Sequence, residues 1–221
     1  MGATFTFNGA PLTLIGGVDA SYPATETDDA VAVACLAVLS FPSLETVRLD
    51  FEPFAPAAEY VPGRLADREL PPYLALLRRC PRPLAPQCVF VDGNGVLHPE
   101  RFGIACRLGV DAATPTIGVA KNLLRVDGVD ARARSKRDRD ASDVGEVELV
   151  DDSGTVVGVA LSGHDVAGVV TKPVYVSAGA GMDLATATAL TRACSRHRVP
   201  EPIRAADVAS RAWLRERQGA S

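Results

Sequence analysis

The chain has 221 residues, of which 47% are apolar and 23% are charged, and its formal net charge is −4. This length suffices for one well-packed core, and no linker rich in Pro, Gly or Ser divides it, so we expect a single domain over residues 1–221. The acidic balance argues against nucleic-acid binding through bulk positive charge, but it is compatible with a local basic groove.

The sequence carries no recognisable targeting or metal-binding cysteine pattern. Its first residues lack a positive region and no apolar run is long enough to cross a membrane, so we expect a cytoplasmic protein. Five cysteines, without CxxC spacing, lie mostly in apolar periodic segments. They indicate buried thiols rather than zinc ligands or disulfides.

The first half of the chain predicts a meander followed by a helix. Extended segments are expected at 12–20, 30–41 and 46–54, and the short links between them are typical of antiparallel strands. The sequence next predicts a helix that Pro71 and Pro72 begin, because proline suits the first helical turn.

The middle of the chain alternates between strands and helices. A short buried strand is expected over 88–92, a helix over 99–108 that Gly109 ends, and a strand over 115–121. Charges of both signs fill residues 125–143, which indicates a solvated loop rather than a binding patch.

The last third predicts a hairpin, a strand and a final helix. The hairpin spans 147–161, and the strand lies within 172–179. Asp183 is a plausible N-cap for the final helix, which ends before Pro200. Three antiparallel strands followed by alternating helices and parallel strands predict a ribonuclease H-like mixed sheet with an added hairpin, in which the first and fourth strands are neighbours.

Two aspartates close apolar strands at positions where ligands bind in such sheets. Asp19 ends the first strand and Asp92 ends the fourth, beside Gly93 and Gly95. An Asp-Gly pair after a strand is also common in simple turns. Two carboxylates on neighbouring strands would repel each other unless a cation lay between them, and Mg²⁺ is the natural candidate.

Six segments in order along the chain form a specific pattern: GVDASY, YVPGRLADRE, VFVDGNGVLHPERFGIA, PTIGVAK, KPVYVSAGAGMDLATA and RVPEPIRAADVASR. With these segments the chain resembles the endonuclease V family of inosine-directed nucleases over nearly its whole length. The resemblance implies an endonuclease that cuts DNA or RNA at the second phosphodiester bond 3′ to inosine, and we expect a monomer. It also implies Mg²⁺ as the cofactor, with Mn²⁺ able to substitute.

The resemblance further assigns roles to individual residues. Asp19, Glu69 and Asp92 would hold the ion, and Lys121 would meet the scissile phosphate. The wedge that separates the strands would be Tyr60, Val61, Pro62 and Gly63. The pocket for the flipped hypoxanthine would be lined by Gly63, Leu65, Gly93, Gly95, His98, Gly103, Ala120 and Leu124.

Each role has a structural alternative. Tyr60 and Pro62 would also suit an ordinary loop, and His98 could simply precede a helix. Glu69 could favour the helix macrodipole, and Lys121 could be a surface lysine at a strand end.

One departure from the family pattern bears on activity. Where the family typically has Gly-His before its last helix, this chain has Gly179-Ala180, so the histidine expected in the active site is absent. Asp183 could supply a compensating metal-site carboxylate or act only as an N-cap. The sequence therefore leaves an active endonuclease and a weakened or inactive inosine-binding relative as alternatives. A ribonuclease H-like nuclease of junctions or hybrids is more remote.

Overall fold

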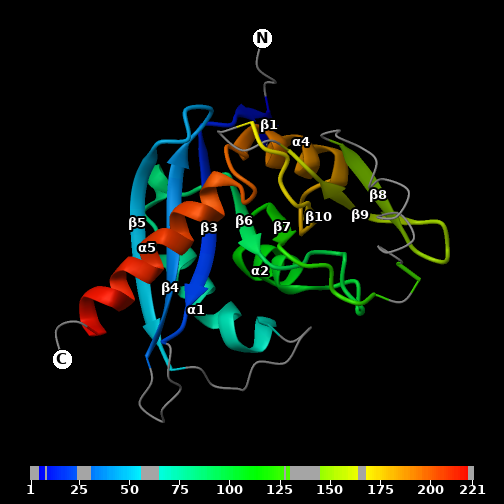
Figure 1. Cartoon of the computed structure of the whole chain (residues 1–221). Helices are drawn as coiled ribbons and strands as arrows, with labels where there is room; N and C mark the ends of the chain where they lie inside the picture. The colour runs from blue at the N-terminus through cyan, green and yellow to red at the C-terminus, as the bar shows by residue number, and fades with distance from the viewer. Residues whose placement is uncertain are drawn as a thin grey trace.

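The computed structural model describes residues 5–7, 9–23, 31–55, 65–126, 128–129, 145–163 and 168–218. These residues form a large mixed sheet with helices on both faces (Figure 1). The strands are β1 (Thr6–Phe7), β2 (Ala10–Pro11), β3 (Leu14–Ser21), β4 (Ala32–Ser40), β5 (Thr46–Phe54), β6 (Cys88–Asp92), β7 (Thr116–Ala120), β8 (Glu146–Val150), β9 (Val156–Leu161) and β10 (Val174–Ala178). The helices are α1 (Leu65–Arg79), the short 3₁₀ helix η1 (Arg82–Leu84), α2 (Ile104–Ala112), α4 (Leu184–Cys194) and α5 (Glu201–Gln218).

The large sheet has the strand order β5-β4-β3-β6-β7-β10-β9-β8. β3, β4 and β5 form the predicted antiparallel meander, and β3, β6 and β7 run parallel to one another. The predicted ribonuclease H-like arrangement is therefore confirmed. Beyond it, β10 pairs antiparallel with β7, and the predicted hairpin of β8 and β9 continues the sheet from β10.

Both faces of the sheet are covered, which explains the near-continuous apolar runs of its central strands. Phe90 of β6 points to the face covered by α4 and α5, where it packs in one cluster with Leu190 and Ile203. Val91 points to the opposite face and packs with Leu108 of α2. The five cysteines are all buried and free, as the sequence predicted.

Two predicted helices have different bounds in the structure. The helix expected to begin at Pro71 already includes Leu65, and both prolines lie inside it. Burial of Tyr73 and Leu76 in the apolar cluster on one face of the sheet stabilises the helix despite the hydrogen bonds that the prolines remove. The helix expected from residue 99 begins instead at Ile104 and continues past Gly109.

The sequence interpretation missed α5 altogether. This helix crosses one face of β3, β4 and β5 at the front of the molecule (Figure 1). Ile203, Ala206, Ser210 and Leu214 are buried at helical spacing along it, so the periodicity was present in the sequence. Within the described residues, no helix is both long and apolar enough to span a membrane.

Candidate active site

The carboxyl ends of β3 and β6 bring two aspartates together. The strands are parallel neighbours and Val18 pairs with Val91, so Asp19 and Asp92 follow side by side. Asp19 is only 6% exposed. The predicted juxtaposition of the two strand-end aspartates is confirmed.

Asp19 lies in an environment that opposes its ionisation. Its pKa is raised from 3.8 to about 9, first by burial and then by the negative charges of Asp92 and Asp207, while Lys121 acts in the opposite direction. The neighbouring carboxyl of Asp92 therefore favours the protonated form of Asp19. A cation beside them would favour the ionised form instead.

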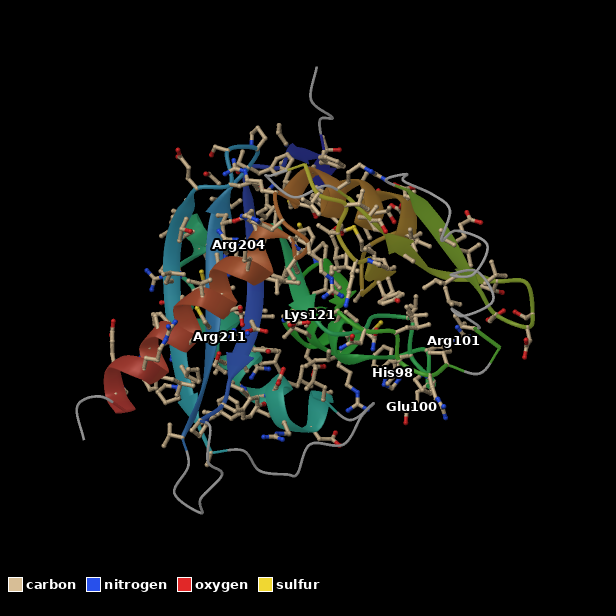
Figure 2. The ribbon with its side chains drawn as sticks, viewed as in Figure 1. His98, Glu100, Arg101, Lys121, Arg204 and Arg211 are labelled. Atoms are coloured by element: carbon tan, nitrogen blue, oxygen red, sulfur yellow. The ribbon has the colours of Figure 1, made fainter. Side chains whose placement is uncertain are left out.

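Lys121 follows β7 and points at the same acidic site. Its Nζ lies 2.5 Å from Asp92 Oδ2. Burial by itself lowers the pKa of Lys121, but the carboxylates of Asp92, Asp19 and Asp207 raise it above its usual value, so the lysine is charged at neutral pH. Figure 2 shows Lys121 near the middle of the molecule, between Arg211 on one side and His98 on the other.

Glu69 comes from the first half of α1 and is held by two tyrosines. The hydroxyl of Tyr22 donates to Oε1 at 2.8 Å, and the hydroxyl of Tyr73 donates to Oε2 at 2.7 Å. Burial raises the pKa of Glu69 from 4.5 to about 7, although both tyrosine hydrogen bonds lower it. The Arg68 guanidinium lies 4.3 Å from the centre of the Tyr22 ring, which helps to fix that tyrosine.

Asp207 of α5 is a member of the acidic site that the sequence interpretation did not single out. It lines the same cleft as Asp19 and Asp92. Arg211, one helical turn later, approaches it at 2.8 Å. The segment RVPEPIRAADVASR, which contains Asp207, was matched to the family as a signature. Because α5 was not predicted, nothing indicated that this carboxylate would face the sheet.

A cleft of about 1140 Å³ opens at this end of the sheet. Its walls come from the ends of β3, β6 and β7, the start of α1, the loops after β6 and β7, and α5. Six of the predicted pocket residues line it: Leu65, Gly93, His98, Gly103, Ala120 and Leu124. The predicted wedge residues Tyr60, Val61, Pro62 and Gly63 lie outside the described residues.

Gly95, also predicted to line the pocket, lies behind the wall of the cleft. A Cβ at this position would be 2.0 Å from the carbonyl oxygen of Ala178. Its amide donates to Ser177 Oγ at 2.9 Å. Glycine at 95 therefore permits the close approach of β10 rather than of a ligand.

The donor set at the acidic site fits a hard divalent cation. All the candidate ligands are carboxylates, which Mg²⁺ prefers. In the described part of the chain, no three His, Cys, Asp or Glu side chains are grouped so that they could hold a metal ion. Mg²⁺ does not need such a cage, because it keeps several waters and is usually bound by one or two carboxylates plus substrate phosphates. Asp19 and Asp92 would supply that pair.

Ala180 lies away from the cleft. β10 is antiparallel to β7, and Tyr175 pairs with Ala120 at the end next to Lys121. Ala180, beyond the other end of β10, donates its amide to Thr116 Oγ1 at 3.0 Å, at the start of β7. The expectation that position 180 holds an active-site side chain is therefore wrong. Residue 180 follows β10, and because β10 runs antiparallel to β7, it lies at the opposite end of the sheet from Lys121.

Asp183 has the capping role that the sequence allowed. Its Oδ1 accepts a hydrogen bond from the Thr186 amide at 2.8 Å at the start of α4. This hydrogen bond lowers the pKa of Asp183, and the side chain is exposed. It does not line the cleft, so the alternative of a compensating metal ligand has no support from its position.

Sequence comparison places these features in a known family. The family model for endonuclease V matches residues 4–208. Endonuclease V of Mus musculus is 45% identical over 213 residues, which cover 94% of this chain and 62% of the mouse protein. The chain thus spans less than two thirds of that relative's length.

Solved structures agree with this match. The catalytic domain of human endonuclease V has a TM-score of 0.86 at 43% identity, covering 95% of this chain and 85% of that one. Endonuclease V of Ciona intestinalis, solved in complex with a 24mer DNA containing an inosine followed by a ribo-adenosine, has a TM-score of 0.84 at 34% identity, covering 93% and 87%. Together with the family-model match, these similarities establish that the chain belongs to the endonuclease V family.

Proposed function

We propose that this protein is a metal-dependent endonuclease that recognises inosine in DNA or RNA and hydrolyses the second phosphodiester bond on its 3′ side, in DNA repair or in the processing of inosine-containing RNA. The observation that carries the proposal is the meeting of Asp19, Asp92 and Asp207 beside Lys121 in one cleft. The inosine-containing DNA in the complex of the Ciona relative supports the choice of substrate.

The acidic residues would form the metal site. Asp19 and Asp92 would hold Mg²⁺, for which Mn²⁺ could substitute, and Glu69 and Asp207 would complete the acidic surroundings. A bound ion there would stabilise negative charge on the phosphate and make a water molecule a better nucleophile. The tyrosine hydrogen bonds to Glu69 would keep its carboxylate oriented while substrate enters.

Lys121 would position the scissile phosphate. Its ammonium carries three donors and uses one on Asp92, so it can also donate to a phosphate oxygen. A charge-assisted hydrogen bond of this kind would hold the phosphate beside the carboxylate pair.

The pocket beside the acidic site would receive the flipped base. A base within a duplex must leave the stack before it can be inspected, and wedge residues can hold the vacated space. The wedge would be Tyr60, Val61, Pro62 and Gly63. Gly93 and Gly103 line the cleft. A Cβ at Gly93 would lie 2.6 Å from Ile104 Cγ2, and one at Gly103 would lie 2.3 Å from the carbonyl oxygen of Asn94, so these glycines permit close packing behind the pocket wall. His98, in the same wall, would contact the base.

The rim of the cleft carries the local positive charge that the composition allowed. Arg107, Arg211 and Arg215 line it together with Lys121, although the chain has a net charge of −4. These side chains would contact phosphates along the strand, so binding should weaken as salt rises. The cleft volume of about 1140 Å³ slightly exceeds the usual range of small-ligand pockets, which suits a polymeric substrate.

A nicking assay tests the proposal. Two end-labelled oligonucleotides that differ only by one inosine would be incubated with the protein in Mg²⁺ or in chelator. We expect a nick only in the inosine strand, only with Mg²⁺, and one nucleotide beyond the bond next to inosine. Equal cleavage of the two strands would favour a general nuclease of junctions or hybrids, and inosine-specific binding without any nick would favour an inactive relative. The absence of a histidine at position 180 does not support the hypothesis of an inactive relative, because Ala180 lies outside the cleft.

A further inference from the structure

The β8–β9 hairpin, which lies beyond the ribonuclease H-like strands, is attached to the loop that carries His98. Arg101 Nη2 in that loop donates to Asp151 Oδ2 at 2.6 Å. Asp151 begins the hairpin turn, and its other oxygen, Oδ1, accepts from the amides of Ser153 and Thr155 at 2.9 and 3.0 Å. One carboxylate therefore closes the turn with one oxygen and holds the loop with the other.

Apolar contacts support the same attachment. Leu97, directly before His98, is fully buried in a small cluster with Val126, Leu149 and Val157. Leu149 and Val157 belong to the two strands of the hairpin, and Val126 lies in the loop after β7, which forms another wall of the cleft. The hairpin therefore packs behind both loops that line the cleft next to Lys121.

The backbone at Arg101 is unusual for a residue with a side chain. Its φ is 55°, in the left-handed region, and its amide donates to the carbonyl of His98 at 2.8 Å. Within the described residues, its Nη1 is also buried without a hydrogen-bond partner. Both features are unfavourable, and such features persist where surrounding contacts hold the residue in place. Figure 2 shows Arg101 on the hairpin side of His98.

We propose that the β8–β9 hairpin braces the base pocket, and that Arg101 and Asp151 are positioning residues that set how closely the His98 wall meets the base. They touch no substrate, since neither lines the cleft. The brace acts through the tight turn from His98 to Arg101 and through Leu97. This inference rests on the proposed function and adds to it a structural source of inosine discrimination.

The test compares variants that break the brace with variants that keep it. Arg101→Met removes the charge, Arg101→Lys retains it, and Asp151→Asn retains the oxygen that closes the turn. For each, kcat and KM would be measured on the inosine strand, and dissociation constants on that strand and on its adenosine counterpart. The control is Glu146→Gln, because Glu146 of β8 makes a 2.6 Å ion pair with Arg192 of α4, away from the cleft.

We expect Arg101→Met and Asp151→Asn to raise KM about two- to five-fold, the range of a partly exposed ion pair, with little change in kcat. Their preference for inosine over adenosine should fall by a similar factor, while Arg101→Lys retains most of it and Glu146→Gln retains all of it. If the preference for inosine over adenosine survives Arg101→Met, or if Glu146→Gln lowers it equally, the proposed bracing role of the hairpin is wrong. Wild-type protein that binds the two strands alike would overturn the proposed function, and this inference with it.

Discussion

At the carboxyl ends of β3 and β6, Asp19 and Asp92 face each other in a partly buried cleft, with the charge of Asp207 nearby. At the opposite end of the sheet, where β7 begins, the polar groups are matched. Thr116 Oγ1 donates to the Ala105 carbonyl at 2.6 Å and accepts from the Ala180 amide at 3.0 Å.

The packing of the two ends differs as much as their charge. At the matched end, a Cβ on Gly109 would lie 2.4 Å from Thr116 Oγ1 and 2.8 Å from the Cβ of Ala180, so no room is left for a ligand. At the acidic end, space remains, and carboxyl groups that repel each other when ionised are left close together. Electrostatic strain of this kind is typical of functional sites, where a ligand relieves it.

The largest expected effect is loss of cleavage on replacing Asp92. Asp92→Ala removes one of the two carboxylates that would hold the ion, so the nick should fall to background while circular dichroism shows a folded protein. The matched change at the far end is Asp183→Ala, which removes the N-cap of α4. That variant should lose about 1 kcal/mol of stability and keep its cleavage rate. An equal loss of cleavage rate in Asp92→Ala and Asp183→Ala would show that the acidic end of the sheet has no special role in catalysis.

The second effect concerns the pH dependence of stability without metal. Because the pKa of Asp19 is about 9 in the folded protein and near 3.8 in the unfolded chain, folding retains a proton that unfolding releases. This group therefore favours the folded state most at acidic pH, and its contribution declines as pH rises from about 4 to about 9.

Asp19→Asn should abolish that dependence. Between about pH 5 and pH 8, urea unfolding should show the free energy of unfolding of the wild type falling, as pH rises, relative to that of Asp19→Asn. Parallel stability curves would show that Asp19 is not electrostatically strained.

A smaller effect is expected from Tyr73→Phe. The ring is kept, but Glu69 loses the hydrogen bond to Oε2, so its carboxylate is less well oriented and harder to ionise. Loss of a group that orients a metal-site carboxylate typically lowers metal affinity or activity about 10- to 100-fold. The Mg²⁺ concentration for half-maximal cleavage should rise accordingly, and an unchanged concentration would argue that Glu69 does not serve the metal site.

A substitution at position 180 should have the smallest effect on the cleavage rate. Ala180→His should leave cleavage unchanged, because this position lies by Thr116 rather than by Lys121. A larger side chain beside Gly109 should instead lower stability by about 1–3 kcal/mol, as overpacking does. Thermal unfolding and the nicking rate would be measured on the same sample. A faster nick would mean that position 180 reaches the cleft after all.

The sequence predicted those parts of the site that depend on strand order. Asp19 and Asp92 could be paired because apolar runs marked their strands, and the order of elements implied that the strands were neighbours. Glu69 was found by resemblance, although its helix begins at least six residues before the expected start at Pro71. Proline is a strong helix-start signal, but here tertiary burial outweighed it.

Other parts depend on how distant segments pack, which local patterns do not encode. Asp207 is brought to the cleft by α5, and its role follows from where that helix crosses β3. Position 180 was misplaced because the direction of β10 is decided by its pairing with β7. The Arg101–Asp151 contact joins residues 50 positions apart and has no sequence signal of its own.

The central claim is that the acidic end of the sheet holds the catalytic ion, and anomalous scattering from Mn²⁺-soaked crystals tests it most directly. The account predicts a peak between the carboxylates of Asp19 and Asp92, on the side facing Asp207, and no such peak in Asp92→Ala crystals. A saturating soak that gives no peak there, or an Mn²⁺ site elsewhere that persists in Asp92→Ala while the cleft stays empty, would contradict it.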